Sequence, residues 1–237
     1  ELVMDGLPTG VTATAIPLPA NFNRIPVILS ATDDAPLSGA RVRLTTRKTD
    51  ADKQDFENRF VQQTWLVRGQ NNRPMWNYFD DRLPVAVTQK LPFRLRLEPL
   101  KSPIVQSGSK AVKVVAERDE GFDERIAVHL LYNPPGVSSN RSLGIEKGQL
   151  EATIPVTAAG NARVGDWPIT VIGTANVRGR VVAATELVTM RVAKPYVAFQ
   201  FPTVATEQGK PVEFTIGVTH ATPFKGAAEV QLLGLPT

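Results

Sequence analysis

The stretch Ile126-Ala127-Val128-His129-Leu130, followed by Asn133-Pro134-Pro135-Gly136-Val137, carries the pattern that decides the fold. In its first half Ile126, Val128 and Leu130 alternate with Ala127 and His129, so every second side chain falls on one face of an extended strand. Its second half has the proline and glycine of a turn. The same period returns elsewhere, at 112–116, 153–156 and 212–216. Short strands separated by turns predict an all-β protein built as a sandwich or barrel.

The turn phrase belongs to a repeat, because Gly6-Leu7-Pro8-Thr9 recurs as Gly234-Leu235-Pro236-Thr237 and, in altered form, at 133–137. Residues match at constant spacing in four sets: Pro8, Gly10, Val11 and Gly39 with Pro134, Gly136, Val137 and Gly165 (126 positions); Thr64, Val67, Arg68 and Gly69 with Thr174, Val177, Arg178 and Gly179 (110); Pro92, Phe93 and Pro99 with Pro195, Tyr196 and Pro202 (103); and Phe122, Val128, Leu130 and Pro134 with Phe224, Val230, Leu232 and Pro236 (102). The first copy therefore carries an insertion, over 45–63. At Gly69 and Gly179 we expect glycine to supply a positive φ for a hairpin turn.

These spacings divide the chain into tandem modules. Residues 92–195 form a complete seven-strand module, 1–91 a module without its first strands, and 196–237 the first three strands of a following one. The seven strands are expected near 93–98, 110–118, 125–132, 138–145, 151–158, 167–177 and 181–193. An incomplete sandwich exposes an apolar face. We expect the insertion to close the first module, and the last segment to pair elsewhere or fray; the terminal pieces could instead associate with each other, within one chain or between copies.

Composition excludes several classes of function. The chain has 237 residues, a formal net charge of +4 and no cysteine. Disulfides, cysteine-bound zinc and thiol nucleophiles are therefore excluded. Basic residues are interspersed with acidic ones, so no nucleic-acid patch is predicted. No apolar run approaches the roughly 20 residues of a membrane helix.

The insertion holds two candidate features, a short helix and a metal site. Residues 50–63 have helical character, with Phe56 and Phe60 at the spacing that makes one apolar face. Asp50, Asp52 and Asp55 resemble the start of a calcium loop, although its glycine and closing glutamate are missing. No cofactor other than calcium is indicated, and a solvated loop is the plainer interpretation of these carboxylates.

Aromatic residues gather in and beside the insertion, within 56–79. Phe56, Phe60 and Trp65 fit a small core for the insertion. Trp76, Tyr78 and Phe79, in the segment 74–81 between prolines, are candidates for binding a sugar or a protein partner. Both interpretations stay open at this point.

No catalytic motif is present. The two histidines, His129 and His220, fall in different repeats, and neither G-x-S-x-G nor H-E-x-x-H occurs. His129 is expected on the face opposite the core. The acidic pairs have no supporting constellation of the kind a glycosidase needs. We therefore expect no enzymatic activity and no catalytic residue.

The repeat resembles the tandem immunoglobulin-like modules of large secreted bacterial proteins of planctomycete type, which often accompany pre-peptidase C-terminal domains. The resemblance lies in Phe224-Lys225-Gly226-Ala227-Ala228-Glu229-Val230-Gln231-Leu232-Leu233-Gly234-Leu235-Pro236, Gly6-Leu7-Pro8-Thr9-Gly10-Val11 and Asp33-Asp34-Ala35-Pro36-Leu37-Ser38-Gly39. It implies immunoglobulin-like sandwiches, an extracellular or cell-envelope location, and a spacer or adhesion role without catalytic residues. The alternatives are a carbohydrate- or protein-binding module using the aromatic segment, and an accessory region of a secreted hydrolase.

Overall fold

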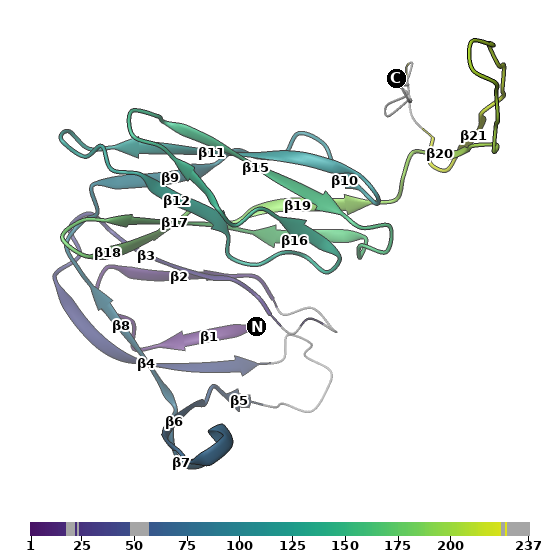
Figure 1. The fold of residues 1–237 in the computed structure, drawn as a ribbon. Coiled ribbons are helices and arrows are strands. Elements are labelled where there is room, and N and C mark those ends of the chain that lie inside the picture. The colour runs from purple at the N-terminus through teal and green to yellow at the C-terminus, as the bar shows by residue number, and fades with distance from the viewer. Residues whose placement is uncertain (18–21, 23, 48–56, 224–225, 227–237) are drawn as a thin grey trace.

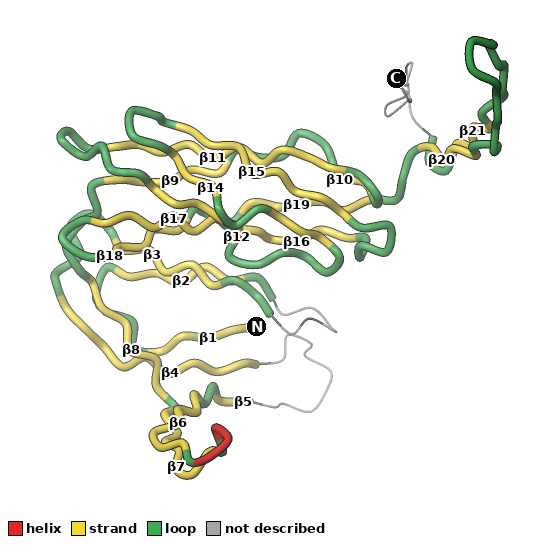
Figure 2. Tube along the Cα trace, in the orientation of Figure 1, coloured by secondary structure: helices red, strands yellow, loops and turns green. Residues whose placement is uncertain are grey.

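The computed structural model describes residues 1–17, 22, 24–47, 57–223 and 226, and strands dominate it (Figures 1 and 2). A single 3-10 turn in these residues, η1 (Gln70–Asn72), joins two of the strands. The strands are β1 (Leu2–Asp5), β2 (Val11–Ala15), β3 (Val27–Ala31), β4 (Ser38–Arg47), β5 (Glu57–Arg59), β6 (Gln62–Arg68), β7 (Pro74–Asp80), β8 (Arg82–Val87), β9 (Phe93–Leu97), β10 (Ile104–Val105), β11 (Ser109–Arg118), β12 (Ile126–Leu130), β13 (Val137–Ser139), β14 (Leu143–Ile145), β15 (Glu151–Ala158), β16 (Gly165–Ile169), β17 (Val171–Asn176), β18 (Arg180–Ala184), β19 (Val188–Ala193), β20 (Val197–Gln200) and β21 (Gly217–His220).

Residues 93–193 form two facing layers, named here the central sandwich (Figure 1). The first layer has the order β13-β15-β11-β9. The second contains β14-β12-β17-β18 and β10-β19-β16. Because only Thr170 separates β16 from β17, these two runs are one layer with a bend. Buried hydroxyls hold the bend: Thr170 Oγ1 donates to the carbonyl of Thr185 at 2.8 Å, and Thr185 Oγ1 accepts from the amide of Val171 at 3.1 Å.

The strand order defines an immunoglobulin-like sandwich. Named A to G along the chain, the strands A, B, E and D (β9, β11, β15 and β13) share one layer, while C, F and G (β12, β16–β17 and β18–β19) share the other. β10 continues strand A, crosses to the second layer and pairs in parallel with β19. The predicted all-β, immunoglobulin-like fold is therefore confirmed.

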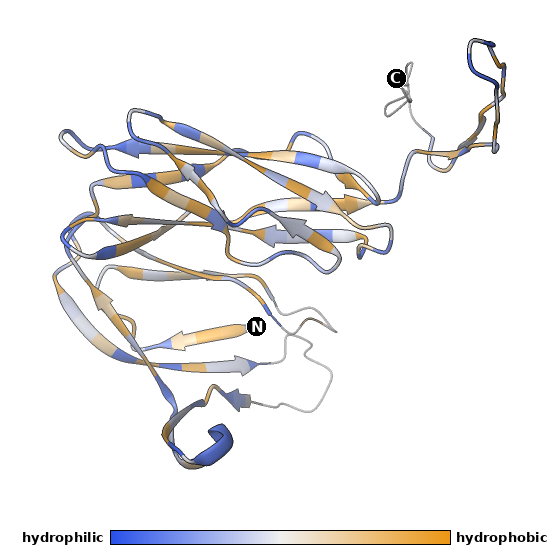
Figure 3. Ribbon diagram, viewed as in Figure 1, coloured by the Kyte–Doolittle hydropathy of each residue, from blue (hydrophilic) through white to orange (hydrophobic). Residues whose placement is uncertain are grey.

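One apolar core fills the central sandwich. Burial alternates along β11 and β15, so that their inward residues are almost completely buried while their neighbours are more exposed. Hydrophobic and hydrophilic residues follow one another along the strands of the sandwich (Figure 3). Burying such a valine or isoleucine side chain stabilises the fold by about 1.5–3 kcal/mol. The largest buried side chains include Phe93, Ile104, Ile126, Leu130, Ile145, Ile154, Ile169 and Met190. The seven predicted strand positions are confirmed, with three strands divided in two. β10 has no predicted counterpart, because two residues show no period.

Residues 1–87, named here the first unit, repeat part of this arrangement. β4 pairs with β1 on one side and with β8 and β5 on the other. This arrangement matches the position of strand F between strands C and G in the central sandwich. β2 pairs with β3 as β13 pairs with β15, since Val11 lies opposite Ala31 and Val137 opposite Ala158. Strands A and B have no counterpart among the described residues 1–17, 22, 24–47 and 57–87.

The recurring proline–glycine phrase is a turn in both described copies. The amide of Val11 donates to the carbonyl of Pro8 at 3.0 Å, and the equivalent bond in 134–137 measures 2.9 Å. Gly10 and Gly136 have φ angles of 78° and 77°. The matching geometry explains why the phrase recurs between strands C and D. The third copy, 234–237, lies outside the described residues.

The insertion does not form the expected helix where it is described. Glu57–Arg59 is strand β5, paired with the end of β4, and β6 begins at Gln62. Phe60 instead donates its amide to the carbonyl of Leu44 at 2.9 Å. The helix prediction is therefore wrong for 57–63, where extended pairing with β4 and β7 satisfies the backbone. Residues 50–56 lie outside the described part of the chain.

The expected glycine conformation is found at one of two hairpins. Gly179 has a φ of 139°, following Arg178 at 51°, in the turn between β17 and β18. Gly69 has a φ of −91°, so the prediction of a positive φ there is wrong. The β6–β7 turn places Asn71 in the left-handed region instead. A Cβ on Gly69 would lie 2.6 Å from Met75 Sδ, which gives this glycine a packing role.

β20 and β21 form a hairpin that projects from the far end of the central sandwich (Figure 1). It reproduces the register of β9 and β11: Phe93–Arg118 corresponds to Val197–His220, and Leu95–Ala116 corresponds to Phe199–Val218. The amide of Asp119 donates to Pro92, and that of Ala221 to Tyr196, both at 2.9 Å. Residues of β20 therefore follow their counterparts in β9 by 104 positions, one more than the 103 positions that separate the matching prolines Pro92 and Pro195.

Candidate functional site

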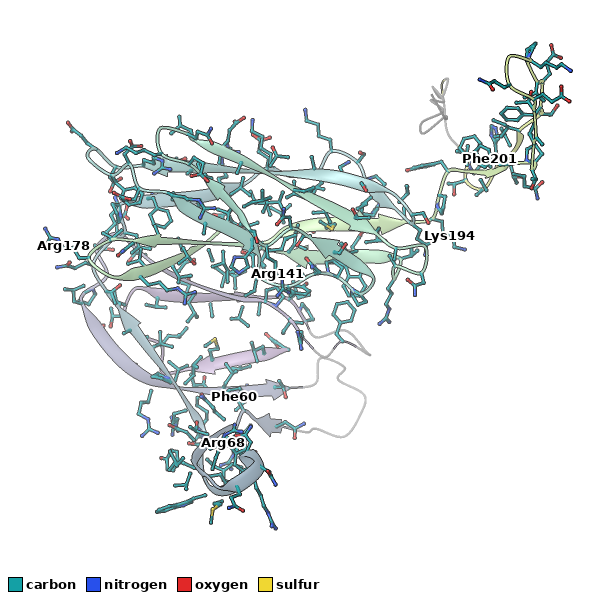
Figure 4. The ribbon with its side chains drawn as sticks, in the orientation of Figure 1. Phe60, Arg68, Arg141, Arg178, Lys194 and Phe201 are labelled. Carbon is teal, nitrogen blue, oxygen red and sulfur yellow. The ribbon has the colours of Figure 1, made fainter. Side chains whose placement is uncertain are left out.

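Exposed aromatic side chains gather on the β6–β7 hairpin, at the end of the molecule opposite the central sandwich (Figure 4). Trp76 is 66% exposed, and Tyr78 and Phe79 are more than half exposed. Phe60 and Trp65 are exposed as well, which contradicts the interpretation of these two as an insertion core. Clusters of exposed large apolar side chains are typical of contact surfaces for other molecules.

The two faces of this hairpin divide the predicted aromatic group. Side chains alternate along β7, so Trp76 and Tyr78 share one face and Phe79 lies on the other with Met75. In the pairing of β6 with β7, Gln63 lies opposite Phe79 and Thr64 lies opposite Tyr78. The structure therefore brings together two of the three predicted residues, and a flat ligand would contact Trp76 and Tyr78 but not Phe79.

An aspartate fixes the base of the aromatic hairpin. Asp80 Oδ1 accepts the backbone amide of Arg82 at 3.0 Å and a guanidinium nitrogen of Arg41 at 2.7 Å. The amide of Arg82, together with the Arg41 charge, holds the pKa of the Asp80 carboxyl below its usual value. Asp80 thus connects β7 to β4 and sets the position of the aromatic residues that precede it.

A second feature, which the sequence analysis missed, is the joint between residues 1–47 and the central sandwich. Phe22 stacks on Trp167 with ring centroids 4.5 Å apart. The guanidinium of Arg163 lies 5.7 Å from the Phe22 ring and 5.9 Å from the Trp167 ring, and the Trp167 indole donates to the Arg163 carbonyl at 3.0 Å. Such contacts add about 0.5–1.5 kcal/mol beyond burial. No sequence period links Phe22 to Trp167, so only the fold reveals the contact.

Beside this stack lies a hollow of about 300 Å³, bordered by Arg24, Arg141 and Tyr132. Burial raises the pKa of Tyr132, whose hydroxyl donates to the carbonyl of Pro168. A further ion pair crosses the joint, with Arg94 2.9 Å from Asp33. The acidic side chain of Asp33 therefore has a structural partner.

The predicted calcium ligands, Asp50, Asp52 and Asp55, lie outside the described residues, and calcium binding there stays a prediction. In the part of the chain that the structure describes, no group of three acidic or histidine side chains could hold a metal ion. His129 is half-buried on the outer face of β12, and His220 ends β21. No helix in the described ranges is long and apolar enough to cross a membrane.

The class of protein is defined by the strand order: immunoglobulin-like sandwiches, with exposed aromatic side chains on a hairpin. No protein-family model and no curated protein matches this sequence. Similar solved structures include the S-layer protein SbsC domains 4 and 5, 14% identical over 62% of this chain and 90% of that one. Another is the Clostridium thermocellum CbhA fibronectin(III)-like modules, 9% identical over 82% and 95%. Both have a TM-score of 0.27, so neither carries the assignment of the fold.

The charged side chains with shifted pKa values have structural partners. The charged residues of the described ion pairs are largely at the surface. The carboxylates with lowered pKa values, Asp80 and Asp166, owe the shift to hydrogen bonds that join neighbouring strands or a turn. These are structural roles, and the absence of enzymatic activity stays a prediction.

Proposed function

We propose that this chain is a non-enzymatic spacer and adhesion segment of a secreted or cell-surface multi-module protein. The observation that carries the proposal is the path of the chain through the central sandwich. It enters at β9 beside the first unit and leaves after β19 at the opposite end, next to Lys194 (Figures 1 and 4). A module with its two connections at opposite ends extends the molecule, as a spacer must.

The pairing of β10 with β19 suits a module that transmits force. These strands are parallel, with Ile104 opposite Val192 and Val105 opposite Ala193. The amide of Gln106 donates to the carbonyl of Ala193 at 2.9 Å. Tension between the two ends acts along these strands, so it loads their hydrogen bonds together, in shear. Resistance to such tension is a property of the unfolding barrier.

Pulling single molecules by their ends tests the proposal. The chain contains no cysteine, so cysteines introduced for Gln89 and Lys194 give unique attachment points on either side of the central sandwich. We expect one cooperative event that releases residues 93–193, with a contour length of about 340 Å. Gradual extension at low force would contradict a load-bearing role.

A second candidate function is binding of a carbohydrate or a protein by the aromatic hairpin, supported by the exposure of Trp76 and Tyr78 on one face. Glycan arrays and pull-downs with the Trp76→Ala variant test it. Met75→Ala is the matched control, because Met75 is equally exposed (70%) but lies on the other face. Binding that is lost in Trp76→Ala and kept in Met75→Ala supports this function, and the absence of any ligand overturns it.

A further inference from the structure

One edge of the β2–β3 layer is unpaired. Within the described residues, β3 pairs with β2 and with no other strand. The amide of Thr32 donates to the carbonyl of Gly10 at 2.9 Å, toward β2. Because backbone groups alternate in direction along an antiparallel strand, those of Val27, Leu29 and Ala31 point to the open edge. An edge of this kind is a template for another strand.

The central sandwich shows which strand belongs there. β15, the counterpart of β3, pairs with β11 through seven residues. Leu29 corresponds to Val156, because Ala31 and Ala158 hold the same register position opposite Val11 and Val137. Among the described residues of 1–87, no counterpart of the hairpin β9–β11, the first two strands of a sandwich, pairs with β3.

The hairpin β20–β21 has the register of β9–β11, and no other strand of the described residues pairs with it. Its apolar face is uncovered: Phe201 is 60% exposed, whereas its counterpart Leu97 is 4% exposed (Figure 4). Phe199 and Val218, paired across the hairpin, are exposed on the same face. The described residues therefore present both an open strand edge and a hairpin of the type that pairs with such an edge in the central sandwich.

The first unit also has space for the hairpin's side chains. A mainly apolar hollow of about 560 Å³ is bordered by Val27, Leu44 and Leu2, and on one side by Leu131 and Tyr132 of the central sandwich. Thr45 Oγ1, also at this hollow, is buried and has no hydrogen-bond partner among the described residues. Transferring the β11–β15 register to β3 and to residues 211–216, which lead into β21 and are extended by this pairing, sets Phe214 opposite Val27. An aromatic side chain at that position would extend into the hollow beside Val27.

We propose that the β20–β21 hairpin of one copy of this chain pairs with the open edge of β3 in a second copy. The central sandwich separates the hairpin from β3 of its own chain (Figure 1), so the pairing is between copies. The contact is head to tail, and repeated contacts of this kind build either closed rings or open chains of molecules. Pro211 is compatible with it, because the register places Pro211 opposite Ser30, where the backbone nitrogen points away from β3.

Disulfide trapping tests the register. Ser30 and Pro211 correspond to Thr157 and Ser109, whose hydroxyl oxygens are 3.0 Å apart in the central sandwich. The Ser30→Cys chain mixed with the Pro211→Cys chain should form a disulfide-linked heterodimer, since paired strands place Cα atoms within disulfide range. The control replaces Pro211→Cys by Glu207→Cys, in the loop of the same hairpin. We expect cross-linking about tenfold faster in the first mixture, from the higher effective concentration; equal rates would overturn the proposal.

Sedimentation at several concentrations gives an independent measurement on the full chain. The unmodified chain should form concentration-dependent oligomers. Phe214→Asp should raise the dissociation constant about tenfold or more, because it buries an unpaired charge. Met75→Asp, on the other hairpin, should leave association unchanged. A monomer at every concentration, or equal association in Phe214→Asp, would overturn the pairing without affecting the pulling experiment.

Discussion

Leu29 and Val156 occupy the same place in two sandwiches, yet the Leu29 side chain is 39% exposed and Val156 is fully buried. Their residue types are both strongly apolar. The difference arises because β11 lies beside β15, whereas the corresponding edge of β3 is open. Whether an apolar side chain is buried in this protein therefore depends on which strand lies beside it, as well as on the sequence of its own strand.

This difference predicts unequal costs of truncation. Val156→Ala should lower the free energy of unfolding of the central sandwich by about 2–4 kcal/mol, because it leaves a cavity in a closed core. Leu29→Ala should cost roughly 1 kcal/mol or less, since much of that side chain already contacts water. Denaturant unfolding at low protein concentration, where association is weak, measures both. Equal losses would show that the β3 edge is covered.

Gly136 should tolerate no larger residue. A Cβ there would lie 2.5 Å from the Ala162 Cα, and its φ is 77°. Gly121 has a similar φ of 82° but nothing within 4 Å of the added atom. Gly121→Ala should therefore cost about 1–2 kcal/mol from the backbone alone, and Gly136→Ala distinctly more. Thermal unfolding of both variants compares them, and an equal loss would mean that the Ala162 loop moves freely.

The buried threonine pair should be intolerant of an apolar replacement at Thr185. Thr185→Val keeps the side-chain shape but leaves the amide of Val171 without its partner at 3.1 Å. An unsatisfied buried donor costs about 1–3 kcal/mol. Thr153→Val, on β15 outside this pair, serves as the control. Chemical denaturation should separate the two variants, and an unchanged Thr185→Val protein would show that water reaches the bend.

The ion pair between Asp166 and Arg191 should make stability depend on pH in the acid range. Arg191 Nε and a second guanidinium nitrogen lie 2.8 and 3.0 Å from the carboxylate, and this hydrogen bonding lowers the pKa of Asp166 from its ordinary 3.8. A carboxyl group whose pKa is lower in the folded state stabilises the fold at pH values above its unfolded-state pKa. This contribution is lost as the pH falls through the folded-state pKa.

The matching variant is Asp166→Asn. It should be less stable than the unmodified chain at neutral pH, and the difference should shrink below about pH 4, as the carboxyl in the unmodified chain takes up its proton. Because both groups are largely exposed, high salt should reduce the difference as well. Unfolding curves over this pH range measure the effect. A difference that persists unchanged at the lowest pH would assign it to packing.

The sequence predicted most of the central sandwich because its strands alternate strictly. Ile126, Val128 and Leu130 point inward along β12, and the proline–glycine turn at 134–137 has the geometry its composition indicates. β10 could not be predicted, since its position depends on β19 across the sandwich. The helix expected near 50–63 failed over 57–63, because pairing with β4 outweighed the local spacing of Phe60.

The candidate sites were less predictable than the fold. Trp76, Tyr78 and Phe79 are exposed as the binding interpretation requires, but the alternation of β7 separates Phe79 from the other two. The stack of Phe22 on Trp167 joins residues that are far apart in the chain, and no local sequence pattern predicts it. The division into modules and the calcium ligands stay predictions.

The force needed to unfold the central sandwich tests the spacer account most directly, when Gln106→Pro is compared with Gln106→Ala. Both variants lose the side-chain bond to the Ala162 carbonyl at 2.8 Å, but only proline also removes the amide that donates to Ala193. We predict that Gln106→Pro unfolds at a clearly lower force than Gln106→Ala when pulled from residues 89 and 194. Equal forces would contradict a load-bearing β10–β19 pair, and with it the central claim that this sandwich carries tension.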